Sequence, residues 1–243
     1  MHSDPVHRSI LAVDIEKSTS ALRTNPIREE LREEVYSMLE ASMGVAGIHA
    51  AHCDPFTDRG DGVLALVHPV DDVPKTLLLN PLIPVLGELL AERNRHLPGP
   101  EHGRRQMRLR VVVHAGEIHY DGKGYFGEAL DVAFRLLDAP RLKEGLSRRP
   151  GPLILAVSDT IYWTIVSQDY EGIPRESYQP MVRVTVSGRR RTGWVQLPDP
   201  AVAERRALTA PRPADAARRV AVLRRGALAP GRRPGQREVP PAA

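Results

Sequence analysis

The chain has 243 residues, of which 42% are hydrophobic and 26% charged, values that are ordinary for a soluble globular protein. No apolar run reaches the roughly 18–20 residues that a membrane-spanning helix needs, and residues 1–8 lack the apolar core of a signal peptide. Because Cys53 is the only cysteine, an internal disulfide is excluded, and we expect a cytoplasmic protein.

The basic character of the chain is concentrated at its C-terminal end. From Asp199 onward there are ten arginines and four acidic residues, a net charge of +6, so the formal +4 of the whole chain leaves about −2 for residues 1–198. Since the same segment is rich in Ala, Arg and Pro, we expect a folded domain over residues 1–198 and a disordered tail over residues 199–243. The tail has no aromatic residue to stack on bases, which argues against nucleic acid and leaves a protein partner open.

Apolar periodicity predicts an alternation of strands and helices along the folded part. In chain order these are strand Ser9–Asp14, helix Ile27–Ala46, hairpin strands His49–Asp58 and Val63–Val67, helix Val73–Asn94, strand Met107–His119, helix Glu128–Glu144, strand Pro152–Ser158, helix Asp159–Val166, and hairpin strands Tyr178–Val186 and Trp194–Leu197. This order matches an α+β fold of the ferredoxin-like kind, with helices packed on a mixed sheet.

Two carboxylates stand out by their positions. Asp14 ends the first predicted strand, and Asp61 lies in the tight Gly60-Asp61-Gly62 turn of the first hairpin. If those strands are neighbours, both carboxylates project at one sheet edge, where hard divalent cations such as Mg²⁺ find the oxygen ligands they prefer. The simpler alternatives are that Asp14 caps a helix and that Asp61 is an ordinary turn residue.

A glycine-rich loop leads into the helix that carries a second candidate group. Asp131 and Arg135 are four residues apart on this helix and so share one face. Taken alone, they are equally consistent with a surface ion pair.

Five segments in register over about Ser9–Pro198 resemble the class III adenylyl and guanylyl cyclase catalytic domain. They are Ile10–Thr19 for the first strand and metal loop, Gly60-Asp61-Gly62 for the hairpin with the second carboxylate, Leu109–Gly116 for the long strand, Tyr125–Leu136 for the helix bearing an Asn and an Arg, and Leu153–Asp159 for a late strand and helix start.

The resemblance implies a role for each matching residue. Asp14 and Asp61, with the backbone carbonyl of Ile15, would hold two Mg²⁺ or Mn²⁺ ions. The loop Lys17, Ser18 and Thr19 would offer backbone N–H groups to the triphosphate at a helix start. Arg135 matches the arginine that stabilises the transition state. In this family two chains pair head to tail and share each site, so the resemblance implies a homodimer that converts an NTP to a cyclic nucleotide.

Three residues depart from the family pattern where the nucleotide is read. The base-reading Lys falls on Thr57, its Asp partner on Gly124, and the ribose-positioning Asn on Asp131. Thr57 is too short to reach a base, Gly124 has no side chain, and an ionised Asp131 accepts but does not donate a hydrogen bond. The pattern resembles divergent bacterial members, including pyrimidine cyclases of phage defence, and also pseudo-cyclases. Two hypotheses follow: an active nucleotidyl cyclase, or an inactive nucleotide-sensing or dimerising module.

The remaining polar residues have simpler expected roles. We expect His114 in the long strand to be packed or hydrogen-bonded. His49, His52 and Cys53 lack a further spaced ligand, which argues against zinc. The run 189–191, three arginines, is expected in a solvated hairpin turn, with phosphate contact as the alternative.

Overall fold

One mixed β-sheet organises the chain. The computed structural model describes residues 4–197, and the tail expected over 199–243 lies outside this range. The strands are β1 (Val6–Ile15), β2 (Thr57–Asp58), β3 (Gly62–Val67), β4 (Leu109–Tyr120), β5 (Tyr125–Phe126), β6 (Leu153–Ser158), β7 (Tyr178–Val186) and β8 (Arg189–Gln196). Their order is β2-β3-β1-β4-β6-β8-β7, and β5 pairs with the end of β4. Only the β4–β6 pair is parallel, so the sheet is mixed, as predicted.

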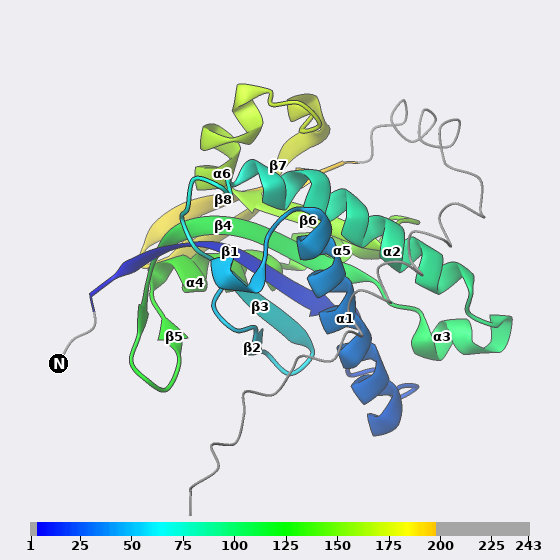
Figure 1. Ribbon diagram of the computed structural model, residues 1–243. Coiled ribbons are helices and arrows are strands. Elements are labelled where there is room, and N and C mark those ends of the chain that lie inside the picture. Colours follow the sequence, from blue (N-terminus) through cyan, green and yellow to red (C-terminus); the bar gives the residue numbers. More distant parts are fainter. Residues whose placement is uncertain (1–3, 198–243) are drawn as a thin grey trace, which may run out of the picture. The chain divides into compact units, whose positions relative to one another are not determined.

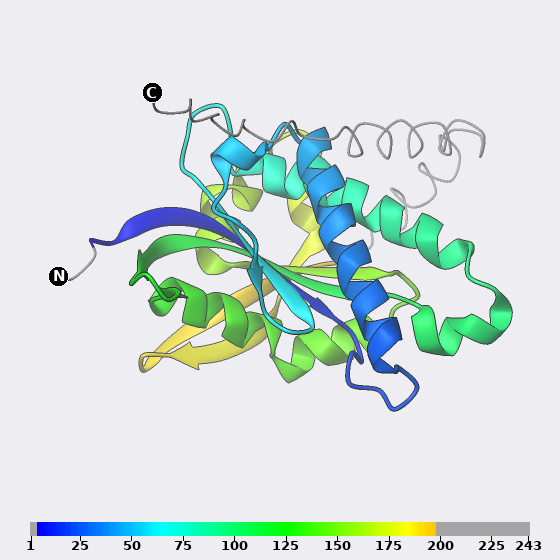
Figure 2. The same cartoon turned by 60° about the horizontal axis from the view of Figure 1, so that its bottom comes forward.

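Helices cover both faces of this sheet (Figure 1, Figure 2). They are α1 (Asn25–Val45), α2 (Ile83–Arg95), α3 (His102–Arg105), α4 (Glu128–Leu137), α5 (Pro140–Ser147) and α6 (Asp159–Thr164). Helices α1, α2 and α6 bury apolar side chains against one face, and α4 and α5 against the other. Within the described residues, no helix is long and apolar enough to span a membrane.

Strand β1 lies between the two helical layers and contributes to both cores. Leu11 and Val13 pack in the core of α1 and α2, whereas Ile10 and Ala12 pack in the core of α4 and α5. A strand buried on both faces needs a continuous apolar run, which is the pattern that predicts it. Because side chains alternate along a strand, Asp14 follows Ala12 onto the α4 side of the sheet.

Prolines divide two of the predicted helices. The helix predicted over Glu128–Glu144 is in fact α4 followed by α5, because Pro140 has no N–H to continue the first helix and instead starts the second. The helix predicted from Val73 is interrupted at Asn80, whose φ of −149° and ψ of 117° are extended, and regular α2 begins at Ile83, after Pro81.

The last hairpin is tighter than predicted. Ser187 and Gly188, with φ of 48° and 73°, form a two-residue turn between β7 and β8. The prediction of a turn over 189–191 was therefore wrong, since these arginines form the start of β8. Arg191 pairs with Glu128 of α4 at 2.5 Å.

Gly62 allows β1 and β3 to approach closely where the two candidate carboxylates lie. Asp14 is opposite Gly62 in the strand pairing, and the Ile15 N–H donates to the Asp61 carbonyl at 3.1 Å. A Cβ placed on Gly62 would lie 2.3 Å from the Val13 carbonyl oxygen, which is far inside van der Waals contact. A larger residue here would push the hairpin, and Asp61 with it, away from β1.

Gly62→Ala is therefore expected to lower the free energy of unfolding by about 1–3 kcal/mol, as overpacking usually does. Gly87 in α2 provides a matched control, because a Cβ there meets no atom within 4 Å. Gly87→Ala should raise the free energy of unfolding by about 0.5–1 kcal/mol through helix propensity. Urea denaturation of the two variants measures both effects, and a Gly62→Ala protein as stable as the wild type contradicts the close approach.

Candidate active site

The two candidate metal ligands lie on neighbouring backbone segments at the end of the central strand β1. Asp14 is the penultimate residue of β1, and Asp61 lies in the turn between β2 and β3, after Gly60 at a φ of 81°. Since β1 and β3 are paired neighbours, the condition for placing both carboxylates at one sheet edge is met.

A pocket of about 380 Å³ opens beside Asp61. It is lined by Ile15, Ser18, Thr19, Arg23, Arg28, Leu31, Arg32, Gly60 and Asp61. The loop from β1 to α1 forms one wall and turns at Lys17, whose φ is 55°. Thr24, and not a residue of this loop, precedes α1, and the Ser18 hydroxyl donates to the Asp61 carboxylate.

Arginines give this pocket a positive wall. Arg23 is 7% exposed and donates only to backbone carbonyls, those of Glu16 at 2.9 Å and Gln106 at 2.7 Å. Arg28, near the start of α1, has a buried Nε without a hydrogen-bond partner. Neither arginine forms an ion pair within the described residues. The Glu16 carboxylate attracts Arg23, and Asp61 also lines the pocket, so the positive charge of this wall is partly compensated. Such a wall suits a polyanion.

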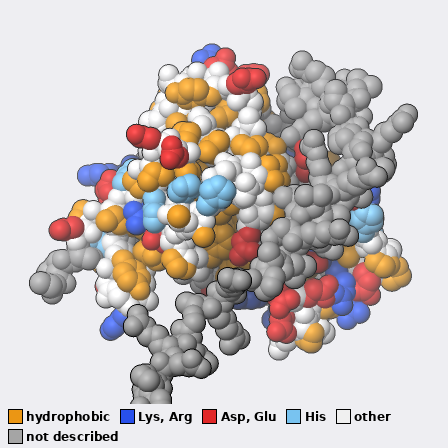
Figure 3. Space-filling model, viewed as in Figure 1, with side chains coloured by type: hydrophobic (Ala, Val, Ile, Leu, Met, Phe, Trp, Pro, Cys, Tyr) orange, Lys and Arg blue, Asp and Glu red, His pale blue; other side chains and the backbone are white. Residues whose placement is uncertain are grey.

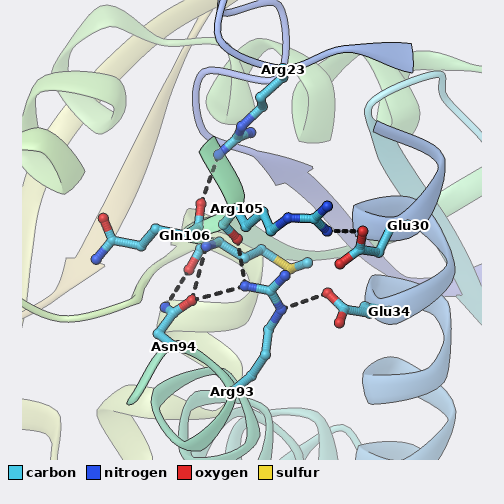
Figure 4. Close-up of polar contacts among 8 residues, drawn as sticks. Arg23, Glu30, Glu34, Arg93, Asn94, Arg105 and Gln106 are labelled. Atoms are coloured by element: carbon cyan, nitrogen blue, oxygen red, sulfur yellow. Dashed lines mark hydrogen bonds and ion pairs between the residues drawn. The ribbon is translucent and has the colours of Figure 1, made fainter. Parts of the chain in front are cut away.

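A polar network fixes the segment before β4 against α1 and α2 (Figure 4). Arg93 of α2 donates to Glu34 of α1 and to the Arg105 carbonyl, both at 2.5 Å. Asn94 bonds both backbone groups of Met107, at 2.7 and 2.9 Å. The Gln106 carbonyl, which accepts a hydrogen bond from Arg23, belongs to this anchored segment. The network therefore also fixes the position of Arg23 in the pocket wall.

The hairpin that carries Asp61 is held from two sides. Arg32 of α1 donates to both carboxylate oxygens of Asp58 at 2.8 Å, and also to the Gly60 carbonyl. This hydrogen bonding lowers the pKa of Asp58. On the other side, the Arg59 guanidinium lies 4.0 Å from the centroid of the Phe134 ring on α4.

Asp14 has a partner that the sequence analysis missed. Arg110, opposite Asp14 in β4, donates through Nη2 to Asp14 Oδ2. Burial lowers the pKa of Arg110, although the guanidinium stays charged. The sequence did contain a signal for this partner. Arg110 interrupts the apolar run of a strand that is expected at the centre of the sheet, and a charge in such a position needs a partner.

The chemistry of this donor set fits a hard divalent cation. Asp14 and Asp61 supply carboxylate oxygens, and residues 4–197 contain no group of three or more acidic, histidine or cysteine side chains placed to hold a metal. Two carboxylates leave most positions of a Mg²⁺ or Mn²⁺ shell to waters and to a phosphate-bearing ligand.

The other predicted site residues lie apart from this pocket. Thr57 is in β2 opposite Leu64, and Gly124 precedes β5 in the extended β4–β5 loop. Asp131 and Arg135 share the exposed face of α4, where neither side chain has an ion pair or hydrogen bond within the described part of the chain. The structure therefore shows two exposed side chains that do not form an ion pair with each other.

His114 has a structural role in the sheet. His114 is 7% exposed, and its Nδ1 lies 2.6 Å from the Ser158 hydroxyl, which confirms the expected hydrogen bond. Histidine side chains gather on the face shown in Figure 3, and the rings of His49 and His52 have centroids 5.6 Å apart. Among the residues that the structure describes, no three or more His, Cys, Asp or Glu side chains are grouped so that they could hold a metal ion.

Comparison with solved structures identifies the fold. The chain is similar to an adenylate/guanylate cyclase/hydrolase from Silicibacter pomeroyi, with a TM-score of 0.54, 19% identity, and coverage of 81% of this chain and 99% of the other. It is also similar to the catalytic core of a rhodopsin-guanylyl cyclase with converted specificity in complex with ATPαS. The TM-score is 0.51 and the identity 16%, with coverage of 81% of this chain and 99% of the other. A third similar structure is the adenylyl cyclase CyaB from P. aeruginosa, with a TM-score of 0.52, 11% identity, and coverage of 82% of this chain and 97% of the other.

The described chain therefore has the catalytic-domain fold of class III adenylyl and guanylyl cyclases, as the sequence resemblance predicted. No protein-family description and no curated protein matches the sequence. The identities of 11–19% make it a divergent example of this fold.

His114 is expected to make stability depend on pH. Burial lowers its pKa from the ordinary 6.5 to about 4, so between these values the unfolded chain binds a proton that the folded chain does not. The free energy of unfolding should therefore fall as the pH drops from 6.5 to 4, by roughly 3 kcal/mol from this group. Urea denaturation across this range should give a flatter profile for His114→Gln. The control His49→Gln, at an exposed position, should keep the wild-type profile.

Proposed function

We propose that the protein is a nucleotidyl cyclase that forms a 3′,5′-cyclic nucleotide and pyrophosphate from an NTP at a homodimer interface. The observation that carries this proposal is the adjacency of Asp14 and Asp61 at the end of β1, beside an arginine-lined pocket, in a cyclase fold.

In this proposal, Asp14 and Asp61 bind two divalent cations, which would acidify the ribose 3′-hydroxyl and hold the phosphates. The pocket beside Asp61 receives the triphosphate, with backbone N–H groups of 17–19 and the wall formed by Arg23 and Arg28. The 3′-oxygen attacks the α-phosphorus, the bond to pyrophosphate breaks, and the hydroxyl proton leaves to solvent. Because attacker and phosphorus belong to one molecule, holding it in a reactive pose supplies much of the rate.

The dimer in this proposal follows from where α4 presents its charges. Arg135 and Asp131 are exposed and lie outside the pocket that contains Asp61. A partner's Asp61 pocket facing this surface would place Arg135 against the α-phosphate, where a fixed cation stabilises developing negative charge. Asp131 would accept a hydrogen bond from a ribose hydroxyl. Each site would then combine cation ligands of one chain with the arginine of the other.

A second candidate is an inactive module that binds a nucleotide or dimerises without turnover. The residues at the base-reading positions favour it, because Thr57 lies in a two-residue strand and Gly124 offers no side chain. Such a module keeps the cyclase fold and the phosphate-facing arginines, and it needs no base selection. Stabilisation by an NTP and a cation without product supports this reading.

Incubation of the purified chain with each of the four NTPs and Mn²⁺ or Mg²⁺ separates the two candidates. The cyclase predicts a cyclic product and pyrophosphate from at least one NTP, detected by chromatography. Asp61→Asn, which keeps the size but removes the charge, should abolish the product. No product from any NTP, with the dimer confirmed by sedimentation, rejects the cyclase and leaves the binding module.

A mixing experiment tests the shared site. Asp61→Ala and Arg135→Ala homodimers should each lose turnover more than apparent affinity, because each change removes stabilisation of the transition state. After subunit exchange, about half the dimers are mixed and each contains one intact site, so activity should return to about a quarter of wild type. No recovery, with exchange demonstrated, contradicts the shared site even in an active enzyme.

A further inference from the structure

Asp14 and Arg110 neutralise each other at the end of the central strands. They are opposite residues in β1 and β4, and their ion pair is largely removed from water, with 13% of the Asp14 side chain and 11% of the Arg110 side chain exposed. Arg110 engages Oδ2 of Asp14, and a divalent cation bound to the same carboxylate would lie beside the Arg110 charge, which repels it. A divalent cation that uses Asp14 therefore has to displace Arg110 or bind against its charge.

Arg110 in turn has no second carboxylate to accept it. Its Nε is already buried without a hydrogen-bond partner, and Asp14 is its one ion-pair partner within residues 4–197. Asp138 attracts Arg110 electrostatically, but it lies 72% exposed and pairs with Lys143 at 3.1 Å. A guanidinium that loses its partner in such a place leaves a buried charge uncompensated, which costs several kcal/mol in comparable sites.

We propose that Arg110 is an exchangeable counter-ion of the cation site. Without a divalent cation it holds Asp14, and when a cation takes Asp14 it passes to an anionic phosphate oxygen of the ligand. This inference rests on the proposed function in one respect, that Asp14 is a cation ligand. It adds that the cation and the polyphosphate stabilise each other's binding through Arg110, so that each alone binds weakly.

The exchange accounts for two features at once. It explains why an arginine is placed beside a carboxylate that is expected to bind a cation, an arrangement that otherwise only weakens cation binding. It also keeps the central strands neutral before the ligand arrives, when an isolated Asp14 between β3 and β4 would be costly to bury.

Cation binding tests the first half of the exchange. Mn²⁺ is titrated into the full chain without nucleotide, and binding is followed by calorimetry. Arg110→Gln should bind Mn²⁺ roughly tenfold or more tightly than wild type, because no charge-assisted pair has to be broken. Arg110→Lys, which keeps the charge but loses the planar fork, should fall between the two. Arg141→Gln removes the same charge from a side chain that is 73% exposed and should change affinity less than about twofold.

Anion binding tests the second half. Inorganic tripolyphosphate is titrated in the presence of excess EDTA, so that no cation takes part. Asp14→Asn releases Arg110 and should bind tripolyphosphate roughly tenfold more tightly than wild type. The double variant Asp14→Asn/Arg110→Gln should lose this gain. Circular dichroism of each variant checks that it is folded, and Asp14→Ser replaces Asp14→Asn if the latter is not.

The outcomes separate this inference from the proposed function, because neither titration measures turnover. Mn²⁺ affinity that is the same in Arg110→Gln and Arg141→Gln overturns the exchange, even if the protein cyclises an NTP. Absence of Mn²⁺ binding in every variant overturns it as well. The two expected gains in a protein that yields no cyclic product leave the exchange standing and reject the cyclase.

Discussion

A carboxylate buried at the end of the central strand is the constraint on which the site depends. Asp14 extends an apolar strand that lies between two helical layers, so its charge has to be met by groups from the neighbouring strands. Arg110 on β4 meets it directly, while Gly62 on β3 lets the hairpin come close enough to bring Asp61 beside it. The register of three adjacent strands is thus coupled to the position of both candidate cation ligands.

The position of Asp61 depends further on contacts from both helical layers. Arg32 of α1 holds the hairpin through Asp58, and Arg59 reaches across to Phe134 of α4. Both contacts are partly exposed, so each contributes only modestly to the stability of the fold. Together they fix the orientation of the hairpin. In the proposed dimer, α4 also presents Arg135 to the partner, so one helix touches the hairpin of its own chain and the site of the other. A shift of α4 would then change the site of its own chain and the site of the partner chain.

The periodicity of the sequence was sufficient for the central strands β1, β3, β4 and β6, because strands buried on both faces leave continuous apolar runs such as Ser9–Asp14. It did not predict β5, and of the strand predicted over His49–Asp58 only Thr57–Asp58 forms. It was insufficient where one proline decides the outcome, as at Pro140, and where a two-residue turn replaces a longer one, as at Ser187-Gly188. The candidate carboxylates could be identified from the sequence because a charged residue at the end of an apolar run is conspicuous. The same argument applies to Arg110, but its partner could be identified only from the strand order. Ser18 shows the reverse case, since a hydroxyl near a helix start suggests a cap and only the fold reveals Asp61 beside it.

In the proposed cyclase, two of the three residues that differ from the family pattern, Thr57 and Gly124, fall at the positions that would read the base, and the third, Asp131, falls at the ribose position. Thr57 and Gly124 leave the base end without long polar side chains, whereas the phosphate end keeps two carboxylates and a wall of arginines. Charged contacts to phosphates and cations supply binding energy that is the same for every NTP. Selection among bases instead needs hydrogen bonds that a wrong base leaves unpaired, and such contacts give the largest discrimination. Within our proposal, a site with this division of residues would bind the triphosphate independently of the base. Selectivity would then have to come from backbone groups or from shape, and not from the two side-chain positions that usually read the purine.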